Sequence, residues 1–304
     1  MVQDITGGRA RSELIARAGE EIQGRSLWDD ARRRLFANKM AVASMIVLGF
    51  IALLALFAPW LSPHDYDAVY WEAIGIPPTL ENSHWFGTDA NGRDLFVRTL
   101  YGARVSLMVG IVTTLVALVI GVTYGAISGY FGGRVDAVMM RIVDVLYSMP
   151  TMFFIIILVV VFGRHIVLVF IAIGCVEWLT MARIVRGQTL SVKRKEYIEA
   201  ARAAGVGIGA IIRRHIIPNV IGPVIVFMTL LVPAVILLES FLSFLGLGVQ
   251  EPMTSWGVLI SEGAQQMENA PWMLIFPAIF LAVTLFCFNF IGDGLRDALD
   301  PKDR

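Results

Sequence analysis

Residues 40–60 read MAVASMIVLGFIALLALFAPW, a run of 21 residues without a charged side chain. A helix needs about 20 predominantly apolar residues to cross the roughly 30 Å of hydrocarbon in a bilayer. In hydrocarbon every backbone N–H and C=O needs an internal partner, which a helix provides. This stretch therefore predicts a transmembrane helix, and it sets the fold class of the whole chain.

The rest of the chain has the same character. Of its 304 residues, 57% are hydrophobic and 16% are charged, and its mean hydropathy of +0.70 exceeds that of ordinary soluble domains. We expect an all-α membrane protein with six transmembrane helices. After the first, the runs that predict them are 105–126, 142–163, 166–182, 219–245 and 273–291.

The basic residues lie mostly on one side of these six runs. The connecting segments on that side hold 21 of the 25 Lys and Arg residues, the opposite segments hold three, and Arg104 stands at a boundary. Cytoplasmic segments carry an excess of Lys and Arg, so both termini and residues 183–218 are predicted to be cytoplasmic. Residues 61–103 then lie outside, and region 40–104 comprises the first transmembrane helix and a small extracytoplasmic lobe.

Two other regions complete the predicted organisation. Residues 1–39 form a cytoplasmic N-terminal segment, in which Trp28 and Phe36 beside several arginines indicate an interfacial helix lying on membrane lipid. Residues 105–304 form the core, with the other five helices. Within the core, residues 246–272 are half apolar and interrupted by Gly and Pro. Irregular backbone at membrane depth must pack against protein or line water, so we expect a re-entrant-like segment there.

Several classes of function lack a supporting motif. The sequence has no G-x-x-x-x-G-K-[ST] phosphate loop, G-x-S-x-G elbow or H-E-x-x-H sequence, so we expect no enzymatic activity and no cofactor bound by this chain. Cys175 and Cys287 stand in apolar runs without metal-ligand spacing, and the four histidines are scattered, so no metal site is predicted. The net charge of zero gives no indication of a nucleic-acid partner.

Small residues form a stripe in the second apolar run. Gly121, Gly125 and Gly129 give the pattern G-x-x-x-G-x-x-x-G, which leaves one helix face without side chains and allows another helix to approach closely. We expect a helix-packing seam, either within the chain or against another subunit.

Three acidic residues fall inside predicted spans. An unpaired carboxylate at the bilayer centre costs about 2.5–3.5 kcal/mol on insertion scales, so each needs a partner or water. Asp144 follows Arg141 by three residues and is expected to pair with it. Glu177 and Glu239 are candidates for a translocation path, and hydrogen bonding between helices is an equal alternative for both.

A polar, glycine-rich segment separates the fourth and fifth apolar runs. Residues 196–220 read EYIEAARAAGVGIGAIIRRHIIPNV. Glu199 opens a predicted short helix, in which the helix dipole favours an early negative charge. Glycines at 205, 207 and 209 are expected to break it, and Pro218 to end or kink a second helix. Such a helix, turn and helix would suit a socket for an external motor, and an ordinary basic loop is the alternative.

This segment carries a family resemblance. Its Glu-Ala-Ala start, the glycine six positions after the Glu, and the later Ile-Pro pair resemble the EAA motif of ABC-importer permeases, the coupling helix that seats in a cleft of the ATPase subunit. His215 stands where many members carry Ile, a familiar departure in the peptide branch. Four further stretches resemble that branch (oligopeptide, dipeptide and nickel permeases), and most of all the C-type subunit of oligopeptide importers, over residues 24–304. They are GRSLWDDARRRLFANKMAVAS from residue 24, FGTDANGRDLFVRTLYGARVSL from 86, SFLSFLGLGVQEPMTSWG from 240 and FNFIGDGLRDALDPK from 288.

The resemblance implies a fold, a set of partners and a function. The fold would be that of a type I ABC-importer permease in the bacterial inner membrane. The partners would be a homologous second permease, two ATPase subunits that bind ATP and Mg²⁺, and an extracytoplasmic peptide-binding protein. The function would be import of oligopeptides by alternating access, with dipeptides, glutathione or nickel as alternative substrates. An ion-coupled secondary transporter and a purely structural scaffold are rivals from other classes.

The resemblance also assigns residues. The motif 87–94, Gly-Thr-Asp-x-x-Gly-Arg-Asp, would order the extracytoplasmic entry to the second span, and a contact with the binding protein is the alternative. In the coupling segment, four residues would form the docking helix and three would support the chain's return, and none would be catalytic. The first group is Glu199, Ala200, Ala201 and Gly205, and the second is Arg213, Arg214 and Pro218.

Overall fold

A computed structural model describes residues 27–163 and 165–299, so the predictions made for residues 1–26 lie outside the described part of the chain. All regular secondary structure in the described residues is helical, apart from one isolated bridge between Thr88 and Asp94. The elements in chain order are α2 (Leu27–Ala37), α3 (Lys39–Leu61), the 3-10 turn η1 (Trp71–Ala73), α4 (Leu95–Phe131), α5 (Gly133–Ser148), α6 (Thr151–Phe162), α7 (Ile166–Val192), α8 (Glu196–Ala203), α9 (Ile208–Ile211), the π-helical turn η2 (Ile212–Ile216), α10 (Ile217–Phe244), α11 (Trp256–Gln265) and α12 (Trp272–Leu299).

Five of these helices are long and apolar enough to cross a membrane, and the bent pair of α5 and α6 makes up to six. The five are α3, α4, α7, the continuous run Ile208–Phe244, and α12. The predicted all-α membrane architecture is therefore confirmed.

One predicted span is wrong as a single helix. The third span, predicted as one helix over 142–163, is broken between α5 and α6, which meet at an angle of 80°. The break falls at Met149 and Pro150, because proline has no N–H to donate and also disfavours helical backbone at the preceding residue. The helix that contains the second predicted run, 105–126, begins earlier, at Leu95, since the Asp94 carboxylate accepts a hydrogen bond from the backbone N–H of Val97 at 2.9 Å and caps the helix there.

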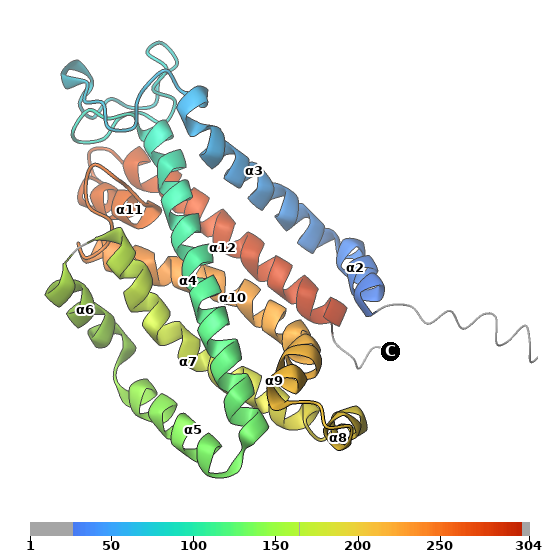
Figure 1. Cartoon of the computed structure of the whole chain (residues 1–304). Coiled ribbons are helices and arrows are strands. Elements are labelled where there is room, and N and C mark those ends of the chain that lie inside the picture. The colour runs from blue at the N-terminus through green and yellow to red at the C-terminus, as the bar shows by residue number, and fades with distance from the viewer. Residues whose placement is uncertain (1–26, 164, 300–304) are drawn as a thin grey trace, which may run out of the picture.

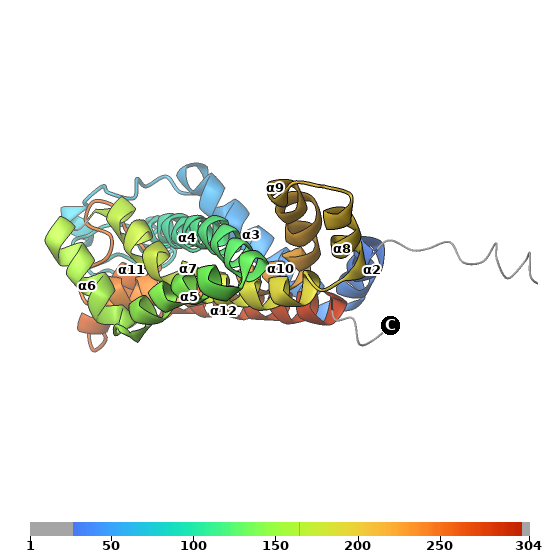
Figure 2. The same ribbon diagram turned by 60° about the horizontal axis from the view of Figure 1, so that its bottom comes forward.

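The helices form an elongated bundle with two distinct ends (Figure 1). Residues 62–94 and α11 lie at one end, called the lobe end below, whereas α2, α8 and the last residues of α12 lie at the other, called the α8 end (Figure 2). Helix α4 is central and packs along α7 and α10, while α12 packs on α3 and α10. Short α11 stands between α10 and α12 in the chain and packs on both, in the segment predicted to be re-entrant-like.

The glycine stripe of α4 is the seam with α7. A Cβ atom added at Gly121, Gly125 or Gly129 would come closer than 3.0 Å to atoms of α7, including the backbone carbonyl of Ala182 and the side chain of Thr189. Only hydrogen fits between these backbones. Of the two alternatives left open by the sequence, the seam lies within the chain.

Candidate docking site

Helix α8 buries one side chain deeply and leaves most of the others exposed. Ile198 is fully buried in a core cluster with residues of α4, α7 and α10. Glu199 and Ala200 are exposed, and Ala201 is half-buried. Glu196 and Glu199 lie in the first turn and Arg202 in the last, the polarity that the helix dipole favours. The free face of α8 is therefore short and carries two carboxylates in its first turn, with the small residues Ala200 and Ala203 exposed behind them.

The backbone after α8 explains the glycine at position 205. The N–H of Val206 donates to the carbonyl of Ala201 at 3.1 Å, and the N–H of Gly205 donates to that of Arg202 at 3.0 Å. These two bonds are a Schellman motif, in which the residue after the cap adopts left-handed backbone. Gly205 has a φ of +76°, which a residue with a side chain adopts at a cost.

The second half of the segment differs from its prediction. Gly209 lies inside α9 and does not take part in the break. Pro218 does not end the second helix, which runs continuously from Ile208 to Phe244. A π-helical turn immediately precedes α10, and in it the N–H of Ile217 donates to the carbonyl of Ile212. Pro218 therefore stands at the start of α10, where a missing N–H is tolerated.

The remaining predicted residues of this segment are on the surface. Arg213 and Arg214 are exposed on the π-helical turn, and His215 is half-buried beside them. Figure 2 shows α8 and α9 side by side at the α8 end, next to the start of α10. The predicted docking residues therefore share one protruding surface.

Helix α8 is also tied to α4. The guanidinium of Arg202 lies 4.8 Å from the centroid of the Tyr130 ring, and its Nε donates to the Tyr130 hydroxyl at 3.3 Å. Nearby, Lys193 donates from Nζ to the carbonyl of Gly129 at 2.7 Å. Packing and polar contacts thus connect α8 and the chain just before it to the end of α4.

Polar pairs missed in the sequence hold α5 against α7. Asp136 accepts two hydrogen bonds from Arg186 at 2.5 Å each. Asp144 pairs with Arg183 of α7 at 2.8 Å, so the predicted pairing with Arg141 is wrong. Asp144 thus pairs with an arginine on the facing helix and not with the arginine on its own helix. The two partners are 39 residues apart in the chain, so their spacing gave no sequence signal.

The two acidic residues proposed for a translocation path differ in environment. Glu239 is fully buried and accepts hydrogen bonds from Ser106 at 3.3 Å and Ser243 at 2.6 Å. This is the arrangement of the helix-bonding alternative. Glu177 is half-buried on α7, and no hydrogen bond or ion pair to it is found among the described residues. The path role of both residues stays a prediction.

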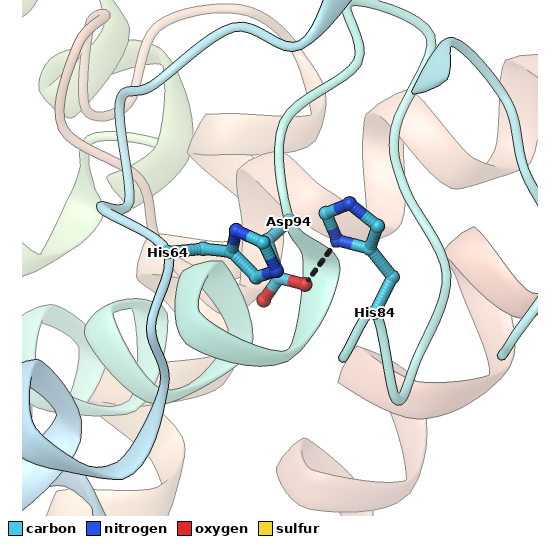
Figure 3. A group of neighbouring side chains, drawn as sticks. All are labelled: His64, His84 and Asp94. Atoms are coloured by element: carbon cyan, nitrogen blue, oxygen red, sulfur yellow. Dashed lines mark hydrogen bonds and ion pairs between the residues drawn. The ribbon is translucent and has the colours of Figure 1, made fainter. Parts of the chain in front are cut away.

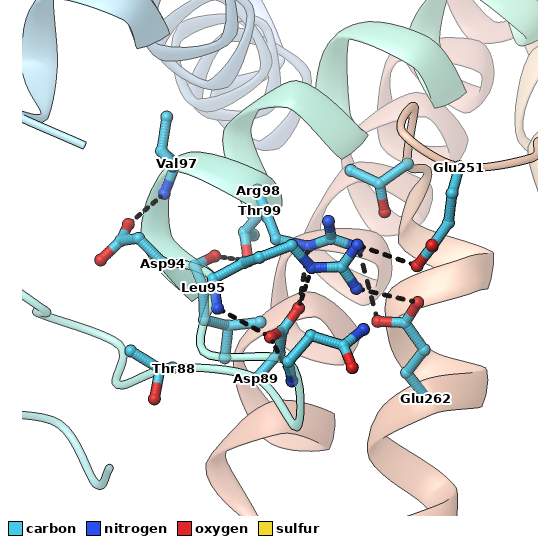
Figure 4. Close-up of polar contacts among 12 residues, drawn as sticks. Thr88, Asp89, Asp94, Leu95, Val97, Arg98, Thr99, Glu251 and Glu262 are labelled. Atoms are coloured by element: carbon cyan, nitrogen blue, oxygen red, sulfur yellow. Dashed lines mark hydrogen bonds and ion pairs between the residues drawn. The ribbon is translucent and has the colours of Figure 1, made fainter. Parts of the chain in front are cut away.

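At the lobe end, a network of charges fixes the start of α4 (Figure 4). Asp89 bonds to Arg93 Nε at 2.6 Å and lies 3.4 Å from Arg98 Nε. Arg93 also donates to Glu251 at 2.8 Å, and Arg98 lies 3.5 Å from Glu262 of α11. Bonds to Asp89 and Glu251 raise the pKa of Arg93 although burial opposes them. Burial raises the pKa of Glu262, against the lowering influence of both arginines.

This network gives a physical basis to the motif at 87–94. The sequence indicated that the motif orders the entry to the second span, and Asp94 and Asp89 do so directly, as helix cap and as ion-pair acceptor. The partners in 246–262, more than 150 residues later, could not be found from spacing. The network therefore joins the motif, α4 and α11 into one rigid unit.

The fold and these contacts define a helical membrane protein with an exposed short helix, α8, at one end and a network of paired charged residues at the other. The chain belongs to the family of binding-protein-dependent transport system inner membrane components, whose model matches residues 121–304. Residues 26–78 match the N-terminal transmembrane domain of oligopeptide transport permease C. The chain is therefore a multi-pass inner-membrane transport component and not itself an enzyme.

Similar proteins cover almost the whole chain. An oligopeptide transport system permease protein of Escherichia coli K12 is 62% identical over 298 residues, which are 97% of this chain and 99% of the relative. One of Haemophilus influenzae is 60% identical over 294 residues, 96% of this chain and 94% of the relative. A dipeptide transport system permease protein of Bacillus subtilis is 47% identical over 280 residues, 92% of this chain and 87% of the relative.

Proposed function

We propose that this chain is the permease subunit of an ATP-driven importer that carries oligopeptides into the cytoplasm by alternating access. The observation that supports this most is the 62% identity, over nearly the full length of both chains, with a permease named for oligopeptide transport. A separate binding protein delivers the peptide in this proposal, so this chain supplies half of the gated path.

Uptake of labelled peptides tests the substrate. Cells lacking this subunit are compared with the same cells after the gene is restored, using a dipeptide and tri- to pentapeptides of similar sequence. We expect restoration to recover uptake of the longer peptides and to leave the dipeptide near background. Recovery of the dipeptide alone would move the substrate to the dipeptide class, and uptake by this chain without an ATPase, driven by an ion gradient, would overturn the importer proposal.

The docking surface is the second part of the proposal. The exposed face of α8, with Glu199, Ala200 and the half-buried Ala201, seats in an ATPase subunit, and Gly205 ends the helix sharply enough for it to enter a cleft. Arg213, Arg214 and Pro218 support the return of the chain. The exposure of this face and its connection to α4 and α10 support this role. Two ATPase subunits bind the ATP and Mg²⁺, and a homologous permease forms the other half of the path.

Orientation follows from the same proposal, with the α8 end and both termini in the cytoplasm. Two single cysteines test it after Cys175 is replaced by Ser, while Cys287 is buried. One is at Leu80, which is 84% exposed at the lobe end, and the other is at Arg134, which is exposed at the start of α5 and outside the proposed docking surface. A membrane-impermeant maleimide is expected to label Leu80→Cys in cells with an opened outer membrane, and Arg134→Cys only after the inner membrane is broken. The reverse pattern would overturn the orientation.

Glu177 is the better of the two candidates for the translocation path, because it lacks the serine partners that occupy Glu239. Glu177→Gln is expected to change the rate or selectivity of peptide uptake without lowering the amount of assembled transporter. Unchanged uptake of every peptide tested would remove Glu177 from the path.

A further inference from the structure

Three side chains able to bind a metal meet at the lobe end (Figure 3). His64 follows the end of α3, His84 lies in the loop before α4, and Asp94 is the residue that caps α4. One ligand atom from each can be chosen so that all lie within 4.8 Å of one another. The residues are 20 and 10 positions apart in the chain, so their spacing gives no metal motif.

Each of the three side chains is held in place. His84 is 3% exposed, and its Nδ1 donates to Asp94 Oδ2 at 2.8 Å. The other carboxylate oxygen of Asp94 accepts from the N–H of Val97. His64 Nε2 lies 3.0 Å from the carbonyl oxygen of Asn82, so the loop positions this ring too. Little side-chain freedom would be lost on binding an ion, because most of it is already lost on folding.

The surroundings of the cluster favour a positive charge. Asp94 is fully buried, and among the described residues its ion-pair partner is His84 alone, with no Lys or Arg in reach. The Tyr70 ring packs edge-on against both imidazoles, at 5.0 and 5.6 Å between centroids. A buried carboxylate without a full countercharge is costly, and a bound cation would offset that cost.

We propose that His64, His84 and Asp94 bind a divalent transition-metal ion, with zinc as the best match. Two imidazole nitrogens and one carboxylate oxygen are a donor set typical of zinc, and three protein ligands leave a fourth tetrahedral position for water. With bonds of about 2.0–2.1 Å, tetrahedral ligand atoms lie about 3.3 Å apart, so the 2.8 Å contact between His84 and Asp94 widens and longer distances in the cluster, all within 4.8 Å, shorten. The ion takes the place of the proton between His84 and Asp94, and the two stacked rings, with centroids 4.2 Å apart, turn to face it.

Such an ion would join three separate segments of the lobe end. It links His64 in the segment after α3, the loop at 79–87 and Asp94, the residue before α4. These segments otherwise meet through hydrogen bonds such as that between His64 Nε2 and the carbonyl oxygen of Asn82. The site depends neither on the transported solute nor on the orientation in the membrane, so it stands or falls independently of the proposed function.

Zinc binding to the full-length chain in detergent tests the site. The chain is purified through a histidine-free tag, stripped with EDTA, and titrated with Zn²⁺ by calorimetry. One ion per chain is expected. His64→Ala is expected to weaken binding by at least about 100-fold, since even residues that only support a ligand contribute 10–100-fold. The control variants His165→Ala and His215→Ala, at the two histidines outside the cluster, should bind like the unmodified chain.

Two further measurements keep the test decisive if a variant folds poorly. Asp94→Asn retains a side-chain oxygen to cap α4 but removes the carboxylate, and it should lose zinc affinity while its helix content and elution volume stay unchanged. Co²⁺ should give the intense visible absorption of a tetrahedral site in the unmodified chain and lose it in His64→Ala. Absence of stoichiometric zinc binding, or equal affinity in the unmodified chain and His64→Ala, would overturn the proposal.

Discussion

Gly205 allows a sharp test of how the docking helix is built, because a second glycine nearby serves as its control. Gly205 and Gly209 are both exposed, and a Cβ atom added at either would meet no atom within 4 Å. They differ in backbone: Gly205 has a φ of +76°, whereas Gly209 lies within α9 and has no positive φ. Alanine at the two positions therefore separates the demand for left-handed backbone from the demand for space.

Alanine is expected to destabilise the structure at position 205 and to stabilise it at position 209. Left-handed backbone costs a residue with a side chain about 1–2 kcal/mol, and the smaller freedom of alanine in the unfolded chain returns roughly 0.4–1 kcal/mol. Gly205→Ala should therefore weaken the turn after α8 by about 1 kcal/mol, a factor of about five in its population. Gly209→Ala should stabilise α9 by up to about 1 kcal/mol, the difference in helix propensity.

Hydrogen exchange along α8 measures the turn, and retention of the ATPase during purification measures docking. Gly205→Ala is expected to speed exchange of the last amides of α8 by about fivefold and to release more ATPase, whereas Gly209→Ala should do neither. Gly205→Asn should recover part of the loss, because Asn tolerates left-handed backbone. If the two alanine variants behave alike, or if Asn is worse than Ala at position 205, the backbone explanation fails.

Three other outcomes follow from the packing. Gly125→Ala should lower the thermal unfolding midpoint in detergent, at an overpacking cost of about 1–3 kcal/mol. Gly187→Ala should not lower it, because a Cβ added there meets no atom within 4 Å. Equal shifts in the two variants would contradict the packing seam between α4 and α7. Glu239→Ala should destabilise the folded chain by about 1–3 kcal/mol, because two buried serines lose their hydrogen-bond acceptor. Glu239→Gln should destabilise it less. The opposite order of the two variants in the same unfolding assay would refute this explanation. Asp144→Asn should change stability by less than about 1 kcal/mol, since the pair with Arg183 is largely exposed, and a larger loss would mean that the pair is shielded.

The sequence predicted the helical class, most of the spans and the short helix and turn between the fourth and fifth spans, because these depend on patterns within one stretch of chain. An apolar run such as 40–60 or a small-residue stripe such as Gly121 to Gly129 carries its own signal. The sequence could not predict that the chain bends by 80° at Pro150, because the direction of the chain after a proline depends on the helices against which the next segment packs.

The contacts that the sequence did not predict join residues far apart in the chain. Asp144 was assigned the nearest arginine on its own helix, and its partner proved to be on α7. Arg93 of the 87–94 motif pairs with Glu251, and Arg98 of α4 pairs with Glu262, both at the lobe end. Charge and spacing show that such residues need partners, but only the packing of helices decides which partners they have.

The continuous helical run Ile208–Phe244 has 37 residues and, at 1.5 Å per residue, a length of about 55 Å. Its first turn follows the glycine-rich bend next to α8, and near its last turn Ser243 lies beside Ser255, the residue that caps α11. The run therefore places one end beside α8 and the other beside α11, so that a single helical segment spans from the α8 end to the lobe end; the π-helical turn Ile212–Ile216 and the prolines at 223 and 233 are the positions where it can bend.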